Sequence, residues 1–216
     1  MNPYRIIDET KWARAVHCAV FRNYAEPNYC VTFELDVTNF LAHVRAEKLS
    51  FTAAMGYAAT ACANRIEAFR YRFLNGRVVL FDHIDTSFTW LGRDEELFKV
   101  ITVPFSGTLA EFCASAVRTA HAQKEYFTGA LGVDVFQCSA LPWIPYTHIS
   151  HTISGKKEVS TPLFDWGKYE KRGEKAIMPF SVQAHHSFVA GVHIGKFYTQ
   201  LQTYLSSFGG DPDAQA

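Results

Sequence analysis

The sequence predicts an α/β protein in which a mixed β-sheet is covered by helices, an α+β two-layer sandwich. Short β-prone runs recur along the chain, and three amphipathic helix patterns are spaced among them. The 216 residues are 48% hydrophobic and 15% aromatic, which is enough apolar material for one sizeable core. We therefore expect a single domain over residues 1–208, followed by a flexible Gly/Asp/Pro-rich tail over 209–216.

Three patterns define the clearest strands. Residues 30–37 alternate apolar and polar side chains, and residues 71–82 place Asn75-Gly76 between two β-prone runs, which is typical of a tight hairpin. Residues 176–184 form a near-continuous apolar run, as expected of a strand covered on both faces. Further strands are expected over 87–91, 98–105 and 143–153.

Three segments have apolar residues at helical spacing. They cover residues 50–66, 108–127 and 192–205. Ser50 is suited to cap the first helix, and Thr108 and Glu111 have the spacing of a capping box at the start of the second.

Charge and cysteine content exclude several classes of protein. Lys plus Arg and Asp plus Glu balance at 21 each, so no basic field favours nucleic acid or an anionic membrane as a partner. No segment approaches the roughly 18 apolar residues of a membrane span, and the charged N-terminus does not resemble a secretory signal. The five cysteines are dispersed without a CxxC motif, so we expect reduced thiols in a cytoplasmic protein.

The most chemical-looking feature is the pair His185-His186 at the end of the apolar run. Adjacent strand residues point to opposite sides, so only one imidazole can face a given site, where it could act as a general base near its pKa of ~6.5. Alone, such a pair is more often structural. The spacing of the other histidines and cysteines gives no metal motif, so no metal is expected. No nucleophile elbow and no phosphate loop occur either.

Several ordered motifs together resemble one enzyme family. They are KWARAVHCAVFRN (11–23) with Trp12, Arg14 and His17, DTSFTW (85–90), CSALPW (138–143), KYEKRGEKAIMPFSVQAHH (168–186), and the helix that follows the histidines. This set, over about residues 4–206, resembles the chloramphenicol acetyltransferase family of the trimeric HHxxxDG type.

The resemblance implies a function and a set of roles. It implies a homotrimer with the active site between subunits, acetyl-CoA as co-substrate, and a small-molecule acceptor alcohol such as chloramphenicol. His186 would be the general base, and Ser139 would donate a hydrogen bond to the tetrahedral oxyanion. On the same resemblance, the CoA side would be lined by Trp143, Lys168 and Tyr169, and the acceptor pocket by Val20, Phe21 and Phe136.

Three positions depart from the family pattern. Ala190 stands where the motif has an aspartate, which leaves Arg14 without its expected partner, and a buried unpaired guanidinium is costly. The resemblance implies that the catalytic histidine is oriented by its own backbone carbonyl, so that aspartate would be scaffold. Asp165 stands where the family has a threonine, and we expect it either to pair with Arg14 or to recognise a cationic acceptor. The loop after Phe21 also differs.

These departures leave three functions open. The first is an O-acetyltransferase acting on chloramphenicol or a similar alcohol. The second is the same fold with a different hydroxyl or amine acceptor. The third is a binding trimer that kept the fold without efficient catalysis, which the changes at Ala190 and Asp165 would favour, whereas the presence of both His186 and Ser139 favours an enzyme.

Overall fold

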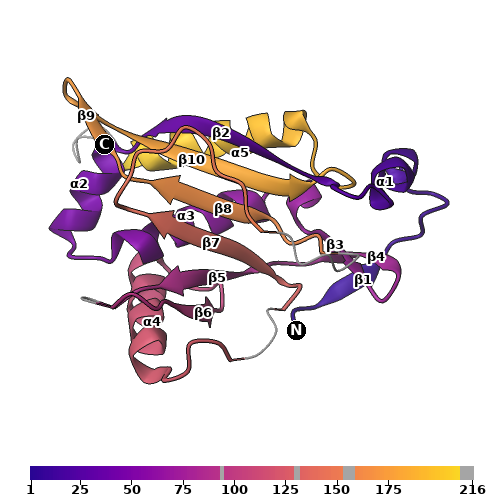
Figure 1. Cartoon of the computed structure of the whole chain (residues 1–216), viewed down its shortest axis with the longest axis horizontal. Helices are drawn as coiled ribbons and strands as arrows, with labels where there is room; N and C mark the ends of the chain where they lie inside the picture. Colours follow the sequence, from indigo (N-terminus) through magenta and orange to yellow (C-terminus); the bar gives the residue numbers. More distant parts are fainter. Residues whose placement is uncertain (93–94, 129–131, 153–158, 210–216) are drawn as a thin grey trace, which may run out of the picture.

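The fold was taken from a computed structural model, which describes residues 1–92, 95–128, 132–152 and 159–209. No helix in these ranges is long and apolar enough to cross a membrane. The helices are α1 (Ala15–Arg22), α2 (Thr38–Ala46), α3 (Phe51–Asn64), α4 (Leu109–Ala122) and α5 (Gly191–Ser206) (Figure 1). The strands are β1 (Tyr4–Ile6), β2 (Asn28–Asp36), β3 (Tyr71–Leu74), β4 (Arg77–Phe81), β5 (Asp85–Trp90), β6 (Lys99–Val103), β7 (Val135–Leu141), β8 (Leu163–Gly167), β9 (Glu170–Arg172) and β10 (Lys175–His185).

The main sheet has seven strands and is mixed, as the sequence predicts. Its order is β2-β10-β8-β7-β5-β6, with β9 paired to the start of β10. The strand pairs β5–β7 and β7–β8 are parallel, and the remaining pairs are antiparallel. Strand β10 lies inside the sheet and is buried along almost its whole length, which confirms the interpretation of its continuous apolar run.

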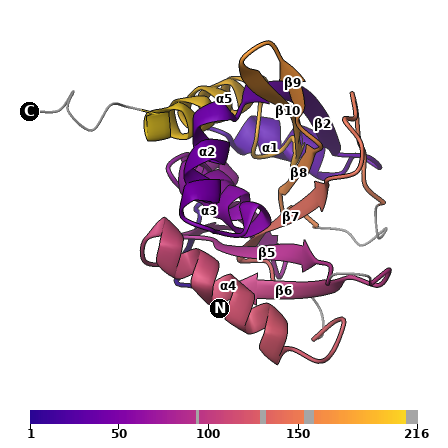
Figure 2. The same cartoon turned by 90° about the vertical axis from the view of Figure 1, so that its left-hand side faces the viewer.

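One face of the main sheet carries the hydrophobic core. Figure 2 shows α3, α4 and α5 on the same side of the sheet. Phe197 of α5 stacks on Phe164 of β8, with ring centroids 5.1 Å apart, and also contacts Phe180 of β10. All three rings are fully buried, so helix α5 is fixed to the centre of the sheet directly after the His185-His186 turn.

The opposite face of the sheet is polar near its centre. Ser139, Asp165 and Ser181 are register partners across β7, β8 and β10, so their side chains share this face. Ser181 shares a hydrogen bond of 2.7 Å with Thr32 of β2. The segment 142–152, which follows β7, runs over this face instead of a helix (Figure 1).

A second sheet of three strands, β1-β4-β3, lies beyond the main one. Its β3–β4 hairpin turns at Asn75 and Gly76, whose φ angles are 52° and 77°. Positive φ at both central residues is what a two-residue hairpin of the right twist requires, so the prediction from Asn75-Gly76 is confirmed.

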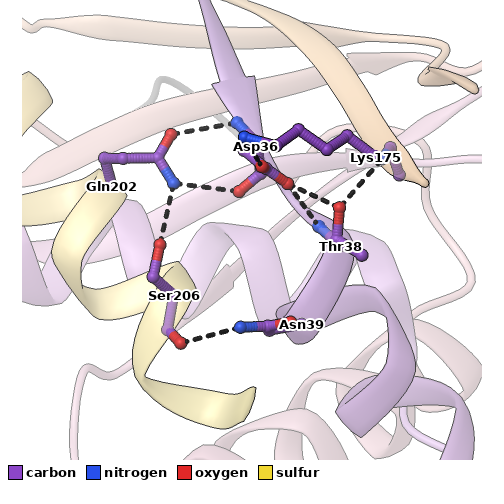
Figure 3. A network of polar contacts seen from close by, with 7 residues as sticks. Asp36, Thr38, Asn39, Lys175, Gln202 and Ser206 are labelled. Carbon is purple, nitrogen blue, oxygen red and sulfur yellow. Dashed lines mark hydrogen bonds and ion pairs between the residues drawn. The ribbon is translucent and has the colours of Figure 1, made fainter. Parts of the chain in front are cut away.

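A polar network joins the far end of α5 to the end of β2 (Figure 3). Gln202 accepts a hydrogen bond from the backbone N–H of Asp36 at 2.9 Å and donates to its carbonyl oxygen at 3.0 Å. The Asp36 carboxylate in turn accepts from Thr38, the first residue of α2, and pairs with Lys175 at 3.2 Å. Together with Phe197, these bonds hold α5 at both its middle and its end.

The predicted helices are confirmed, with Ser50 capping α3 and Thr108 and Glu111 forming the capping box of α4. The strand expected over 143–153 is wrong for its described part: residues 142–152 form turns and irregular chain. Pro142 and Pro145 cannot donate ladder hydrogen bonds, and the segment packs on the sheet face instead of joining an edge. The elements that went unpredicted are β1, β7, β8, β9, α1 and α2.

Candidate functional site

His186 lies in the turn between β10 and α5, with its ring between two aromatic side chains. The ring centroids of Phe21 and Tyr29 lie 4.1 Å and 4.7 Å from that of His186. His186 Nδ1 lies 3.0 Å from the carbonyl oxygen of Val189. Because a carbonyl oxygen can only accept, Nδ1 carries the proton and Nε2 keeps a lone pair. The half-buried imidazole is therefore held in the tautomer that a general base needs.

His185 is turned into the core instead. It is 3% exposed, and its Nδ1 accepts a hydrogen bond of 3.2 Å from the backbone N–H of Ser187. Burial, together with the nearby His186, lowers the pKa of His185 to about 4, so this ring stays neutral. The two adjacent imidazoles therefore lie in different surroundings, as the alternation of side chains predicts.

Arg14 holds the same turn through main-chain oxygens. Its Nε donates to the carbonyl oxygen of Ser187 at 2.7 Å, and its Nη2 donates to that of His186 at 3.1 Å. Among the described residues, no carboxylate lies within 4 Å of its guanidinium, so the expected Arg14–Asp165 pair is absent. Partial burial lowers the pKa of Arg14, and the two carbonyl dipoles supply the compensation that Ala190 cannot.

Position 190 begins helix α5 without a side-chain cap. The backbone of Ala190 is extended, and its N–H donates to Nδ1 of His193 at 2.9 Å. A second expectation also needs correction here, because the His186 ring is oriented by the carbonyl of Val189 and not by its own. The His186 carbonyl is instead used by Arg14. The turn is therefore held by hydrogen bonds without an acidic side chain at position 190.

A cavity of about 820 Å³ opens on the polar side of the sheet. Its lining includes Ser139 from β7, Thr89 from β5, and Trp143 and His151 from the segment that covers the sheet. Trp143 is 66% exposed, so a large apolar ring stands free at the rim. The volume falls in the range of small-molecule sites, and the mixed lining suits a ligand with polar and apolar parts.

Two polar residues lie beside Ser139 in this region. The Thr89 hydroxyl donates to Ser139 Oγ at 3.5 Å, the long limit of such a bond. Asp165, the register partner of Ser139 on β8, is fully buried, and its Oδ1 lies 2.7 Å from Nε2 of His151. Asp165 therefore pairs with His151. The backbone N–H of His151 donates a hydrogen bond of 3.2 Å to Oε1 of Gln183, which holds His151 near the end of β10.

Ser139 and His186 of one chain are far apart. Ser139 is aligned with Ser181, two strands away, and His185 lies four residues further along β10. With about 4.8 Å between strands and 3.3 Å per residue, the two candidate catalytic residues are separated by more than about 15 Å. They cannot contact the same reacting group within one chain.

The other predicted site residues divide into three groups. Phe21 packs on His186 and Val20 is exposed beside it on α1. Lys168 is exposed, and the Tyr169 hydroxyl accepts a 2.6 Å hydrogen bond from Arg45. Phe136 lies in the core against Phe164, so it does not line the cavity: alternation along β7 turns its neighbour Gln137 to that side.

Sequence reasoning missed His151 and Tyr29. The strand predicted over 143–153 contains His151, whereas this residue lies in the irregular segment over the sheet. The available signal was Asp165, because an acid in an otherwise apolar strand requires a partner when it is buried. Tyr29 carried no such signal, since its contact with His186 depends on the pairing of β2 with β10.

Within the described ranges, no cluster of three or more His, Cys, Asp or Glu side chains is placed to hold a metal ion.

The family model described as "Chloramphenicol acetyltransferase" matches residues 1–202. A chloramphenicol acetyltransferase from Klebsiella sp is 27% identical over 210 residues, which cover 96% of each chain. A chloramphenicol acetyltransferase 2 from Escherichia coli is 26% identical over 200 residues, covering 91% of this chain and 94% of the relative.

Solved structures show the same relationship. A chloramphenicol acetyltransferase superposes with a TM-score of 0.86 and 27% identity, covering 94% of this chain and 100% of the other. A probable dihydrolipoamide acetyltransferase from Listeria monocytogenes superposes with a TM-score of 0.67 and 14% identity, covering 97% and 96%. At that identity the second match shows a shared fold alone.

Proposed function

Because the chain belongs to the chloramphenicol acetyltransferase family, we propose that it transfers an acetyl group from acetyl-CoA to a hydroxyl group of chloramphenicol or of a similar small alcohol. The observation that carries the proposal is the geometry of His186. Its Nδ1 is bound to a carbonyl oxygen, so its Nε2 is free to accept a proton. Arg14 stabilises the same turn by donating hydrogen bonds to its main-chain oxygens. Acetyl-CoA enters as a substrate, and no metal takes part in the proposed chemistry.

The reaction divides between two residues. His186 Nε2 takes the proton of the acceptor hydroxyl as its oxygen attacks the thioester carbonyl, and a tetrahedral intermediate forms with negative charge on oxygen. Ser139 Oγ donates a hydrogen bond to that oxyanion. Collapse of the intermediate breaks the carbon–sulfur bond, the proton on His186 passes to the departing thiolate, and the products are the acetyl ester and CoA.

A mechanism that uses both His186 and Ser139 requires more than one chain. Since Ser139 and His186 of one subunit are more than about 15 Å apart, the proposal places His186 of one subunit opposite the Ser139 cavity of the next, in a homotrimer. Trp143 at the cavity rim, with Lys168 and Tyr169, would line the CoA side, and Val20 and Phe21 on α1 would approach the acceptor. The proposed setting is the cytoplasm.

A thiol-release assay with acetyl-CoA and chloramphenicol tests the proposal. The wild-type protein should release CoA, and His186→Ala should lose at least about 10²-fold in kcat, because a positioned general base contributes 10²–10⁴-fold. His121→Ala, a change of an exposed histidine on α4, is the matched control and should leave the rate unchanged. Equal rates for His186→Ala and wild type would remove the catalytic role of His186.

A second candidate function differs only in the acceptor. Asp165 places a carboxyl group beside Ser139, the proposed oxyanion donor, which would suit a cationic acceptor instead of chloramphenicol. In the same assay, CoA release with other small alcohols or amines but not with chloramphenicol would identify this case. Release with none of them would favour a binding trimer.

A further inference from the structure

A buried carboxyl group lies beside the proposed oxyanion donor. Asp165 is 0% exposed and is the direct register partner of Ser139 across the parallel pair β7–β8, so both side chains point to the cavity face. Oδ1 of Asp165 bonds to His151, whereas Oδ2 is buried without a hydrogen-bond partner among the residues that the structure describes. An ionised Asp165 therefore places a poorly compensated negative charge next to the point where acyl transfer develops another.

This arrangement opposes the reaction unless the charge is cancelled. Two like charges at neighbouring positions of a partly buried site repel one another, and the developing oxyanion would have to form against that field. The hydrogen bond from Ser139 cannot offset a full negative charge, because a hydroxyl contributes only a dipole. A compensating cation is needed within reach of Asp165.

His151 meets this requirement by its geometry. Its Nε2 lies 2.7 Å from Asp165 Oδ1, and its ring lines the same cavity as Ser139. Its backbone N–H donates to Gln183 Oε1 at 3.2 Å, which ties the residue to β10. Nδ1 of His151 has no hydrogen-bond partner among the described residues and is not sealed from solvent, so it can hold a second proton.

We propose that His151 is a charge-compensating residue of the acyl-transfer site, which as an imidazolium cancels the charge of Asp165 and so permits an oxyanion to form at Ser139. The inference rests on the proposed function. It assigns to the His151–Asp165 pair an ionisation that controls activity.

The other ionisable groups near Asp165 do not change their charge near neutral pH. Burial raises the pKa of the thiols of Cys30 and Cys138 and of the Tyr146 hydroxyl, so these groups stay neutral near pH 7. Glu96 lies elsewhere on the cavity lining and is exposed. The hydrogen bond with Asp165 raises the pKa of His151 above its ordinary value of 6.5, and burial raises the pKa of Asp165. While the pair holds its proton it is neutral overall, and it gains a net negative charge as pH rises through the raised pKa of His151.

The test compares pH profiles of kcat/KM for wild type, His151→Gln, Asp165→Asn and the double variant. Wild type should show a profile that falls at alkaline pH, as His151 loses its proton. His151→Gln leaves Asp165 uncompensated and should lose at least about 10-fold across the profile, approaching the 10²–10³-fold effect of removing an oxyanion donor. Asp165→Asn removes the charge and should abolish the falling limb.

The double variant separates this role from a structural one. If the loss in His151→Gln is electrostatic, then adding Asp165→Asn should recover about 10-fold or more of the lost rate. His148→Gln, a change of an exposed histidine in the same segment, is the matched control and should behave as wild type. Histidine NMR titrations should show the pKa of His151 falling in Asp165→Asn, whether or not a substrate is present.

The outcomes are distinguishable. A profile without a falling limb, an inactive double variant despite a native thermal unfolding curve, or a His151 pKa that does not change in Asp165→Asn overturns the inference while leaving the proposed function intact. No CoA release by the wild-type protein with any acceptor overturns the proposed function and the inference together.

Discussion

His186 is held by three hydrogen bonds to residues that lie outside strand β10. Its backbone N–H donates to the carbonyl of Pro27, its own carbonyl accepts from Arg14, and its ring is fixed by the carbonyl of Val189. Position 190 is an alanine, so Arg14 is held by main-chain dipoles, which are weaker than a carboxylate. The orientation of the imidazole does not depend on an acidic side chain.

Placing an acid at position 190 should add stability. Ala190 has the extended backbone of an N-cap without a capping side chain, and a polar cap contributes about 1 kcal/mol to the free energy of unfolding. Ala190→Asp should gain about that amount, plus a charge interaction of about 0.3–1 kcal/mol with the helix N-terminus and Arg14. Urea unfolding measures the gain.

The matched control for that change is Ala190→Asn, which caps equally well and carries no charge. The difference between the two variants isolates the contribution of the charge beside Arg14. If Ala190→Asp were less stable than wild type, the main-chain bonds of Arg14 would have to be incompatible with a carboxylate, contrary to this description.

His185 should make the protein sensitive to mild acid. Its pKa is lowered to about 4 in the folded chain, against 6.5 when unfolded, so below pH 6.5 the unfolded chain binds a proton that the folded chain does not. Stability is therefore complete above pH 6.5 and falls as pH decreases toward 4, by about 2 kcal/mol at pH 5.

Unfolding free energies at pH 7 and pH 5 check this expectation. His185→Asn can still accept the hydrogen bond from Ser187 but does not titrate, so its stability should fall less between the two pH values. His121→Asn, at an exposed position, should keep the wild-type slope. An unchanged slope in His185→Asn would show that another group causes the acid sensitivity.

At the scale of elements, the hydrophobic pattern of the sequence predicted the helices and strands that pack regularly. It did not predict those whose position depends on contacts between distant segments. The apolar run of β10, the Asn75-Gly76 hairpin and the caps of α3 and α4 each depend on neighbours in sequence, and all were predicted. Strand β8 was missed because Asp165 interrupts its apolar pattern, and the reason for an acid there, His151, lies in a segment whose path is set by tertiary contacts.

The packing of the segment 142–152 should be sensitive to substitutions in strand β8, which it covers. A Cβ at Gly167 of β8 would lie 2.8 Å from Cγ of Pro179 and 2.9 Å from the carbonyl oxygen of Ile144, which also accepts the N–H of Lys168. Gly167→Ala should therefore lower the free energy of unfolding by about 1–3 kcal/mol, since overpacking forces backbone shifts. It should also lower kcat/KM, because Trp143 and the cavity rim move with the segment.

Gly195→Ala is the control, because a Cβ there meets nothing within 4 Å in helix α5. Alanine is favoured over glycine in a helix interior by up to about 1 kcal/mol, so this variant should be as stable as wild type or more so. If Gly167→Ala were as stable as Gly195→Ala, the segment would not be packed against β8 as described.

At the scale of the whole molecule, the two candidate catalytic residues lie in different regions. His186 is beside α1 and β2 beyond the end of β10, whereas Ser139 lies at the centre of the polar face, under the segment 142–152. Motifs in the sequence identified both residues, but their separation follows from strand register, which no single motif contains. The central claim is that one subunit supplies the base and its neighbour supplies the oxyanion donor.

Complementation between two inactive variants tests that claim most directly. His186→Ala and Ser139→Ala are purified alone and after co-expression in equal amounts, and CoA release is measured with acetyl-CoA and the acceptor. In a ring of mixed subunits, a site is intact when its base comes from the Ser139→Ala chain and its serine from the His186→Ala chain, which gives about a quarter of the wild-type rate per site. Activity in the mixture no greater than that of either variant alone would contradict the account.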